Sequence, residues 1–208
     1  MRKLRFVPLV LFATLLMARS ARAITYGEPD NGEHPYVGFM IFFDPSVPGW
    51  FSCSGTLLDP TTFLTAGHCT FGIGTNGEAE GSSGGTDVWV TFEETTVLEG
   101  FPPRNEDDPY PARAAWLEAN PIYIRGTSYP NPDYNNFADF PQNNDIGIVV
   151  LDEPAPVNTF GVLAPLGTAD ALAAVPRDRN DMLVETVGYG TQSVQPQHPR
   201  LQLAQAQR

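Results

Sequence analysis

The chain has 208 residues, with 12 Lys and Arg against 24 Asp and Glu, so its formal net charge is −12. A surface this acidic repels nucleic acid phosphates and anionic lipid, and we expect neither as a partner. Glycine (19) and proline (20) are abundant and 42% of residues are apolar, a composition that favours short strands joined by irregular loops around a packed core.

The first 23 residues are typical of a signal peptide. They combine a basic start, a 12-residue apolar run from Phe6 to Met17, and the small residues of Ala21–Ala23 before a cut at Ile24. The alternative is a membrane anchor, but a bilayer span needs about 20 apolar residues. We therefore predict a secreted protein, extracellular or periplasmic, that begins at Ile24 and leaves the membrane once the leader is removed.

Removing the leader makes the chain more acidic. The leader carries five of the 12 basic residues and none of the 24 acidic ones, so seven basic and 24 acidic residues remain, a net charge of −17. A soluble exported surface explains this balance, and a preference for cationic substrates or a salty medium is the alternative.

Six segments before Asp152 read as strands. They are 36–43, 52–58, 62–66, 87–92, the weaker candidate 112–119, and 146–151, with loops at 72–85 and 121–144. Segment 87–92 alternates with period two, whereas 146–151 is a continuous β-branched run typical of a buried strand. Six strands can close a small antiparallel barrel, so we assign residues 24–152 to one β-barrel.

The chain after Asp152 is rich in proline and alanine. It offers a short helical turn at 170–175 and two strands, 182–190 and 201–207. Two strands cannot bury an apolar face of their own. Residues 153–208 are therefore predicted to be a connector followed by the first strands of an incomplete second barrel.

The two cysteines, Cys53 and Cys69, are predicted to form a disulfide, because export places them where disulfides persist. The bridge would close a loop of 15 residues and stabilise the fold by about 3 kcal/mol. Two buried thiols are the alternative. No metal or other cofactor is expected, since the cysteines and the scattered His34, His68 and His198 lack ligand spacing.

His68 is the strongest candidate for chemistry. It directly follows a predicted strand and the small residues Ala66 and Gly67, and Cys69 next to it can tie its backbone down. A general base must be held within hydrogen-bond reach of its nucleophile, and such an anchor would hold it there. Taken alone, a His-Cys pair more often marks a structural histidine beside a structural disulfide.

Four motifs together resemble the trypsin-like, chymotrypsin-fold serine protease family. Thr65–Cys69 reads Thr-Ala-Gly-His-Cys against the family's Thr-Ala-Ala-His-Cys, and Asn144–Leu151 is similar to its Asn-Asp-Ile-Ala-Leu-Leu segment. Val187–Gly190 resembles the Gly-Trp-Gly that opens the second barrel, and Ile24–Gly27 resembles the mature terminus Ile-Val-Gly-Gly. The resemblance implies an all-β, chymotrypsin-like double antiparallel β-barrel with the first barrel complete and the second only begun. It is nearest to the bacterial secreted branch, because Ile24 follows the leader without a propeptide.

What the resemblance implies for function is a secreted serine endopeptidase acting on a protein or peptide substrate as a monomer. His68 would be the general base and Asp145 the carboxylate that orients it, in a rigid and dry position at the head of a buried strand. The family's Gly-Asp-Ser-Gly-Gly-Pro does not occur after Gly190, and Ser193 lacks flanking glycines. We therefore expect a C-terminally truncated, inactive form. The alternative is a non-catalytic homologue that serves as a secreted binding module.

A second, unrelated constellation is weaker. Gly81–Gly85 fits Gly-x-Ser-x-Gly, and Ser83, Asp145 and His198 follow the chain order of α/β-hydrolases. That nucleophile elbow must follow a buried strand and open a helix, whereas a polar stretch precedes Ser83 and a strand follows. A flexible loop is the preferred interpretation. Three acidic residues flank this loop: Glu78, Glu80 and Asp87. A solvated acidic loop is favoured over a calcium site for them.

Overall fold

The computed structural model describes residues 28–73, 85–95, 98–103, 110–139, 141–175 and 184–190, and the backbone of 202–207. The predicted leader 1–23 and the predicted mature terminus Ile24 lie outside these residues. The same holds for the expectations placed on Ser83, Ser193, His198 and the acids Glu78 and Glu80.

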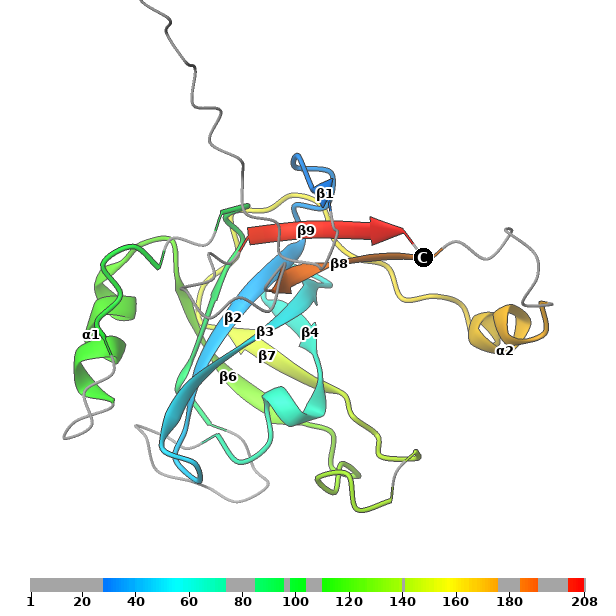
Figure 1. Ribbon diagram of the computed structural model, residues 1–208, viewed down its shortest axis with the longest axis horizontal. Helices are drawn as coiled ribbons and strands as arrows, with labels where there is room; N and C mark the ends of the chain where they lie inside the picture. The colour runs from blue at the N-terminus through cyan, green and yellow to red at the C-terminus, as the bar shows by residue number, and fades with distance from the viewer. Residues whose placement is uncertain are drawn as a thin grey trace, which may run out of the picture.

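Within the described residues, six antiparallel strands close a barrel in the order β2-β3-β4-β7-β6-β5 (Figure 1). They are β2 (Val37–Asp44), β3 (Gly49–Leu57), β4 (Thr62–Thr65), β5 (Val88–Thr91), β6 (Ile124–Pro130) and β7 (Gly147–Leu151). Five of them match predicted strands to within about three residues at each end. The prediction of a closed six-stranded antiparallel barrel is therefore confirmed.

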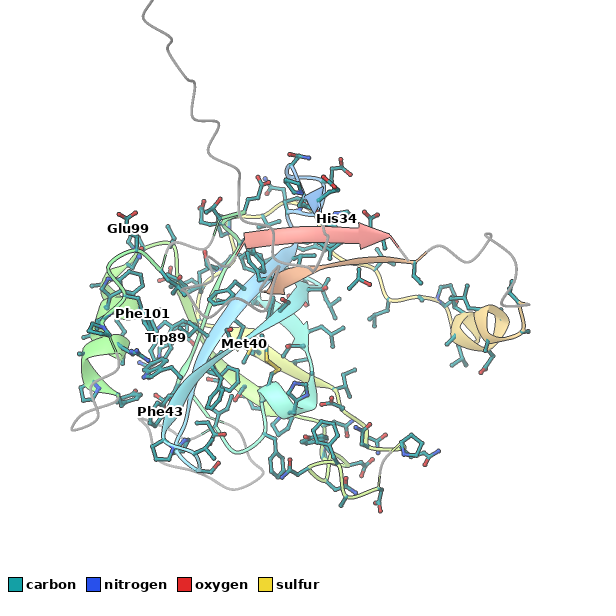
Figure 2. All side chains as sticks on the ribbon, viewed as in Figure 1. His34, Met40, Phe43, Trp89, Glu99 and Phe101 are labelled. Carbon is teal, nitrogen blue, oxygen red and sulfur yellow. A yellow bond between two sulfur atoms is a disulfide. The ribbon has the colours of Figure 1, made fainter. Side chains whose placement is uncertain are left out.

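Apolar side chains fill the barrel interior and also cover one outer face. Met40 and Val90 belong to the interior cluster, while Phe39 and Trp89, the residues beside them in the chain, belong to a second cluster outside the barrel. Figure 2 labels Met40 and Trp89 among the side chains of these clusters. Because β2 is buried on both faces, its sequence is almost continuously apolar rather than alternating.

The prediction of a strand at 112–119 is wrong, because Pro111–Ala119 forms helix α1. Proline is tolerated at the start of a helix, because the backbone N–H that it lacks would have no partner within the helix there. The alanine-rich sequence that follows also favours a helix. Ala114 and Leu117, three residues apart, are buried on one side of the helix against the outer apolar cluster. The apolar residues of this segment therefore follow helical spacing.

The prediction of an uninterrupted loop at 121–144 is also wrong, because β6 lies inside it. Its sequence, Ile-Arg-Gly-Thr-Ser-Tyr-Pro, has no apolar alternation, so local pattern does not identify it as a strand. It pairs with β5 on one side and β7 on the other, which satisfies its backbone groups. At Gly126 an added Cβ would lie 2.6 Å from Val149 Cγ1, so only glycine fits this close approach.

Beyond the barrel, β8 (Glu185–Gly190) and β9 (Gln202–Gln207) pair with β1 (Glu28–Pro29) in the order β1-β9-β8. Helix α2 (Thr168–Ala173) has no buried residue and lies away from the barrel at the end of the connector (Figure 1). The predicted helical turn and both predicted strands are thus present with shifted ends. No helix in the described part of the chain is long and apolar enough to cross a membrane.

Candidate active site

A disulfide fixes the backbone beside His68. The histidine lies in a short 3-10 helix, Gly67–Cys69, that follows β4 directly. Cys69 is buried and bonded to Cys53 of β3, with the two Cα atoms 6.4 Å apart. The predicted disulfide is confirmed, and it joins the turn that carries His68 to a neighbouring strand of the barrel.

Asp145 is presented by a tight turn at the start of β7. Asn144 adopts a left-handed φ of 48°, which asparagine tolerates better than most residues. The amide of Ile146 donates to the carbonyl of Asn144 at 2.7 Å, closing a three-residue turn around Asp145. The Asn-Asp-Ile sequence therefore has a local reason, because this turn lets the chain bend at Asp145 just before β7 begins.

The structure brings His68 and Asp145 together from positions 77 residues apart. The His68 amide donates to Asp145 Oδ1 at 2.8 Å, and the ring atom Nδ1 lies 2.9 Å from Oδ2 and 3.1 Å from Oδ1. One carboxylate thus holds both the backbone and the ring of the histidine. Because Nδ1 is engaged, Nε2 is the ring nitrogen left to exchange a proton with another group.

Asp145 is more exposed than predicted. The His68 side chain is 49% exposed and that of Asp145 is 22% exposed, so the expected dry position is wrong. Partial burial alone would raise the pKa of Asp145. Hydrogen bonds from the His68 backbone and ring, the charge of His68 and the Gly67 backbone outweigh it, and the pKa of this carboxyl lies below its usual range.

An aromatic group that the sequence analysis missed borders His68. The ring of Phe137 is 5.8 Å from the imidazole, and Tyr134 packs edge-on against both Phe137 and Phe71. Phe137 has a φ of 65°, a left-handed conformation that a bulky residue seldom adopts and that its surroundings must hold in place. Nothing in the local sequence of this loop signals that conformation or its proximity to the histidine.

The one departure from the Thr-Ala-Ala-His-Cys pattern has a steric cause. An added Cβ at Gly67 would lie 3.0 Å from Ile146 N, 3.0 Å from Tyr134 Cγ and 3.1 Å from Ile146 O. Alanine would crowd two backbone atoms and the attachment point of a ring. Glycine therefore lets β7, which begins beside Asp145, approach the turn that carries His68.

The donor atoms of Cys53, His68 and Cys69 lie within 4.8 Å of one another, the spacing of a metal site. The two sulfurs are bonded to each other, however, and a metal is held by thiolates. In this oxidised state the three residues do not fit a metal ion.

Asp87, the described member of the acidic group considered for calcium, is fully buried. It accepts a hydrogen bond from Tyr110, and Arg125 lies 4.0 Å away. Burial, followed by the hydrogen bond and charge of Asp87, raises the pKa of Tyr110, which keeps that hydroxyl a donor. Asp87 therefore ties the segment before α1 to the barrel instead of belonging to a solvated loop.

No protein-family model matches the chain, and no curated protein sequence matches it. Solved structures match it in fold. A structure of GrC is 17% identical with a TM-score of 0.51, covering 90% of this chain and 63% of that one. A structure of HL collagenase is 15% identical with a TM-score of 0.51, covering 88% and 62%. A scabies mite inactivated protease paralogue is 13% identical with a TM-score of 0.54, covering 88% and 61%.

At these identities the likeness establishes the fold alone. The chain is mostly β, with a closed six-stranded antiparallel barrel, and has a chymotrypsin-like fold; the structures similar to it are serine proteases of that fold and their homologues. It spans a little over three fifths of the length of these structures, 61% to 63%.

Proposed function

We propose that this chain supplies the general base and the orienting carboxylate of a secreted serine-type endopeptidase. The observation that supports it most strongly is the approach of His68 Nδ1 to within 2.9 Å of Asp145 Oδ2, beside a disulfide. The His68 side chain is also 49% exposed, which leaves the ring open to a reacting group, whereas His34, whose Nδ1 likewise meets a carboxylate, is 19% exposed. In a serine peptidase both are required, because the outer nitrogen takes the proton and the inner one must stay protonated.

In this mechanism a serine hydroxyl attacks the peptide carbonyl while His68 Nε2 removes its proton. Asp145 accepts the Nδ1 hydrogen, fixes the tautomer and stabilises the imidazolium that forms. His68 then returns the proton to the leaving amine. The amine leaves and the acyl group stays on the serine as an ester, which a water molecule deprotonated by His68 then hydrolyses to free the serine. Backbone donors that stabilise the oxyanion usually supply the largest catalytic contribution.

The nucleophile is proposed to come from sequence that follows Arg208 in a longer, bacterial-type polypeptide, of which this chain is a truncated form. The 208 residues hold no Gly-Asp-Ser-Gly segment. In this proposal the leader 1–23 is removed during export and Ile24 becomes the mature terminus. Residues 24–152 would form the first domain, and residues 153–208 would begin the second.

The decisive experiment has two steps. Reading the gene past the codon for Arg208 in three frames should reveal Gly-Asp-Ser-Gly within roughly 30–60 codons, given the usual size of such barrels. The completed protein should hydrolyse casein and react with a fluorophosphonate probe, and the 208-residue chain should do neither. Failure to find the serine motif in any frame contradicts the proposal.

Matched histidine variants test the roles in the completed protein. His68→Ala should lower kcat/KM by at least about a thousandfold, and Asp145→Asn should cause a loss of similar order. His34→Gln is the control, because His34 Nδ1 also meets a carboxylate, Asp30 Oδ1 at 2.6 Å, in another part of the chain. Equal losses in His34→Gln and His68→Ala would refute a special role for His68.

The second candidate function is a secreted, non-catalytic binding module. It is favoured by the inactivated protease paralogues among the similar structures. This function requires residues 24–208 to be stable alone. A cooperative thermal melt of that product, together with a gene that encodes no serine motif downstream, would establish it over the peptidase. Aggregation or a non-cooperative melt would exclude it.

A further inference from the structure

The loop between β6 and β7 contains two adjacent residues with a left-handed backbone conformation. Asn136 has a φ of 54° and Phe137 has a φ of 65°. Asparagine tolerates this region, whereas a bulky aromatic residue seldom adopts it. Residues in such conformations persist only where their surroundings fix them, and they cluster at functional sites. Phe137 thus occupies a backbone position that is unfavourable for its residue type.

Burial does not explain why a phenylalanine occupies this position. Phe137 is 43% exposed, so a large part of its apolar surface gains nothing from leaving water. Glycine adopts a positive φ without the steric penalty of a side chain. If stability alone decided the residue type, glycine or asparagine would therefore be favoured at position 137.

The Phe137 ring lies against the imidazole of His68, with 5.8 Å between the ring centroids and 36° between the ring planes. The Asp145 carboxylate holds this imidazole at one atom, Nδ1, from 2.9 Å. A hydrogen bond at one ring atom fixes a point, and the half-exposed ring can still swing about it. Because two rings cannot overlap, Phe137 blocks one direction of that movement.

Packing and backbone hydrogen bonds hold the Phe137 ring in place. Tyr134 is buried and packs edge-on against it, with 5.6 Å between the centroids. Tyr134 also packs edge-on against Phe71, which follows the 3-10 helix of the histidine. The Tyr134 amide donates to the Asn131 carbonyl at 2.9 Å, and the Asn131 amide donates to the Ile146 carbonyl at 2.9 Å. The loop is therefore tied to the segments that follow both members of the pair.

We propose that Phe137 is a positioning residue, whose ring holds the His68 imidazole in the orientation that keeps Nδ1 on the Asp145 carboxylate. It acts through His68 and takes no part in proton transfer. The left-handed backbone is retained because it delivers the ring to this place. The catalytic consequence rests on the proposed function, whereas the placement of the imidazole is a property of the 208-residue chain and is measured without catalysis.

The test compares Phe137→Gly with the matched control Asn136→Gly in the 208-residue chain. Both variants place glycine at a left-handed position, so both should keep or raise the midpoint of urea denaturation. Phe137→Gly alone should make the Nδ1 proton of His68 exchange with water at least about threefold faster, as expected for the loss of one aromatic contact. Long-range proton–nitrogen spectra should then show a mixture of imidazole tautomers. Phe137→Tyr keeps the ring and should behave like the wild type.

In the completed peptidase, Phe137→Gly should lower kcat by about tenfold or more through misplacement of the base, with KM changed by less than about twofold. A raised KM with an unchanged kcat would assign the ring to substrate binding and overturn the inference.

The measurements on the 208-residue chain decide the inference even where no serine motif follows. It is wrong if Phe137→Gly leaves proton exchange and the tautomer unchanged, or if Asn136→Gly alters them equally. It is also wrong if Phe137→Gly unfolds at a lower urea concentration than the wild type, because the ring would then stabilise the fold itself. None of these results bears on the peptidase proposal, which the serine motif and the His68 variants decide separately.

Discussion

Replacing Gly67 with alanine should loosen the candidate active site, although the resembled family carries alanine there. The new methyl carbon would meet Ile146 N and Tyr134 Cγ at 3.0 Å and Ile146 O at 3.1 Å. All three contacts are several tenths of an ångström below an ordinary carbon contact of about 3.5 Å. Ile146 directly follows Asp145, so the shift that relieves the crowding moves the carboxylate away from His68.

The expected cost is that of overpacking, about 1–3 kcal/mol of unfolding free energy, because two of the three crowded atoms belong to the backbone. Urea denaturation measures the loss, and Gly67→Ser should cost more than Gly67→Ala. Long-range proton–nitrogen spectra of the imidazole report whether the Nδ1 hydrogen bond weakens. If Gly67→Ala melts like the wild type with an unchanged imidazole spectrum, the steric explanation for this glycine is wrong.

Three further predictions concern stability. Reducing the Cys53–Cys69 disulfide, or replacing both cysteines with alanine, should lower the free energy of unfolding by about 3 kcal/mol in urea titrations; an equal midpoint with and without reductant would contradict this. Because the pKa of Asp145 is depressed in the folded state, its contribution is present above the unfolded value near 4 and is lost as pH falls through the folded one. Asp145→Asn should therefore weaken the pH dependence of the free energy of unfolding below about pH 4. If that dependence is unchanged in the variant, other carboxylates are responsible for the loss of stability in acid. Ser54 Oγ accepts from the Tyr189 amide at 2.7 Å and donates to its carbonyl at 3.2 Å, so Ser54→Ala should cost about 1–2 kcal/mol and speed hydrogen exchange at that amide; unchanged exchange would mean that β8 is held by other contacts.

Sequence alone was sufficient for the elements whose burial leaves a local pattern. The strands β2, β5 and β7 are continuous or alternating apolar runs because they line the barrel interior, and they lie close to their predicted ranges. The disulfide was predicted from two cysteines and the predicted leader, and the structure contains it. His68 and Asp145 were both singled out from short motifs, and the structure places their side chains in contact.

Only the tertiary structure revealed the features that depend on contacts with residues far away in the sequence. Strand β6 has no apolar alternation and exists because β5 and β7 each need a partner, while α1 follows a helical spacing that covers Trp89. The ring of Phe137 reaches His68 only through a left-handed backbone position. Gly67 is required by atoms of Ile146, which lies 79 positions further along the chain. The local sequence determines backbone preferences and the spacing of apolar residues. The features named above depend instead on which distant segment of the chain packs beside each residue.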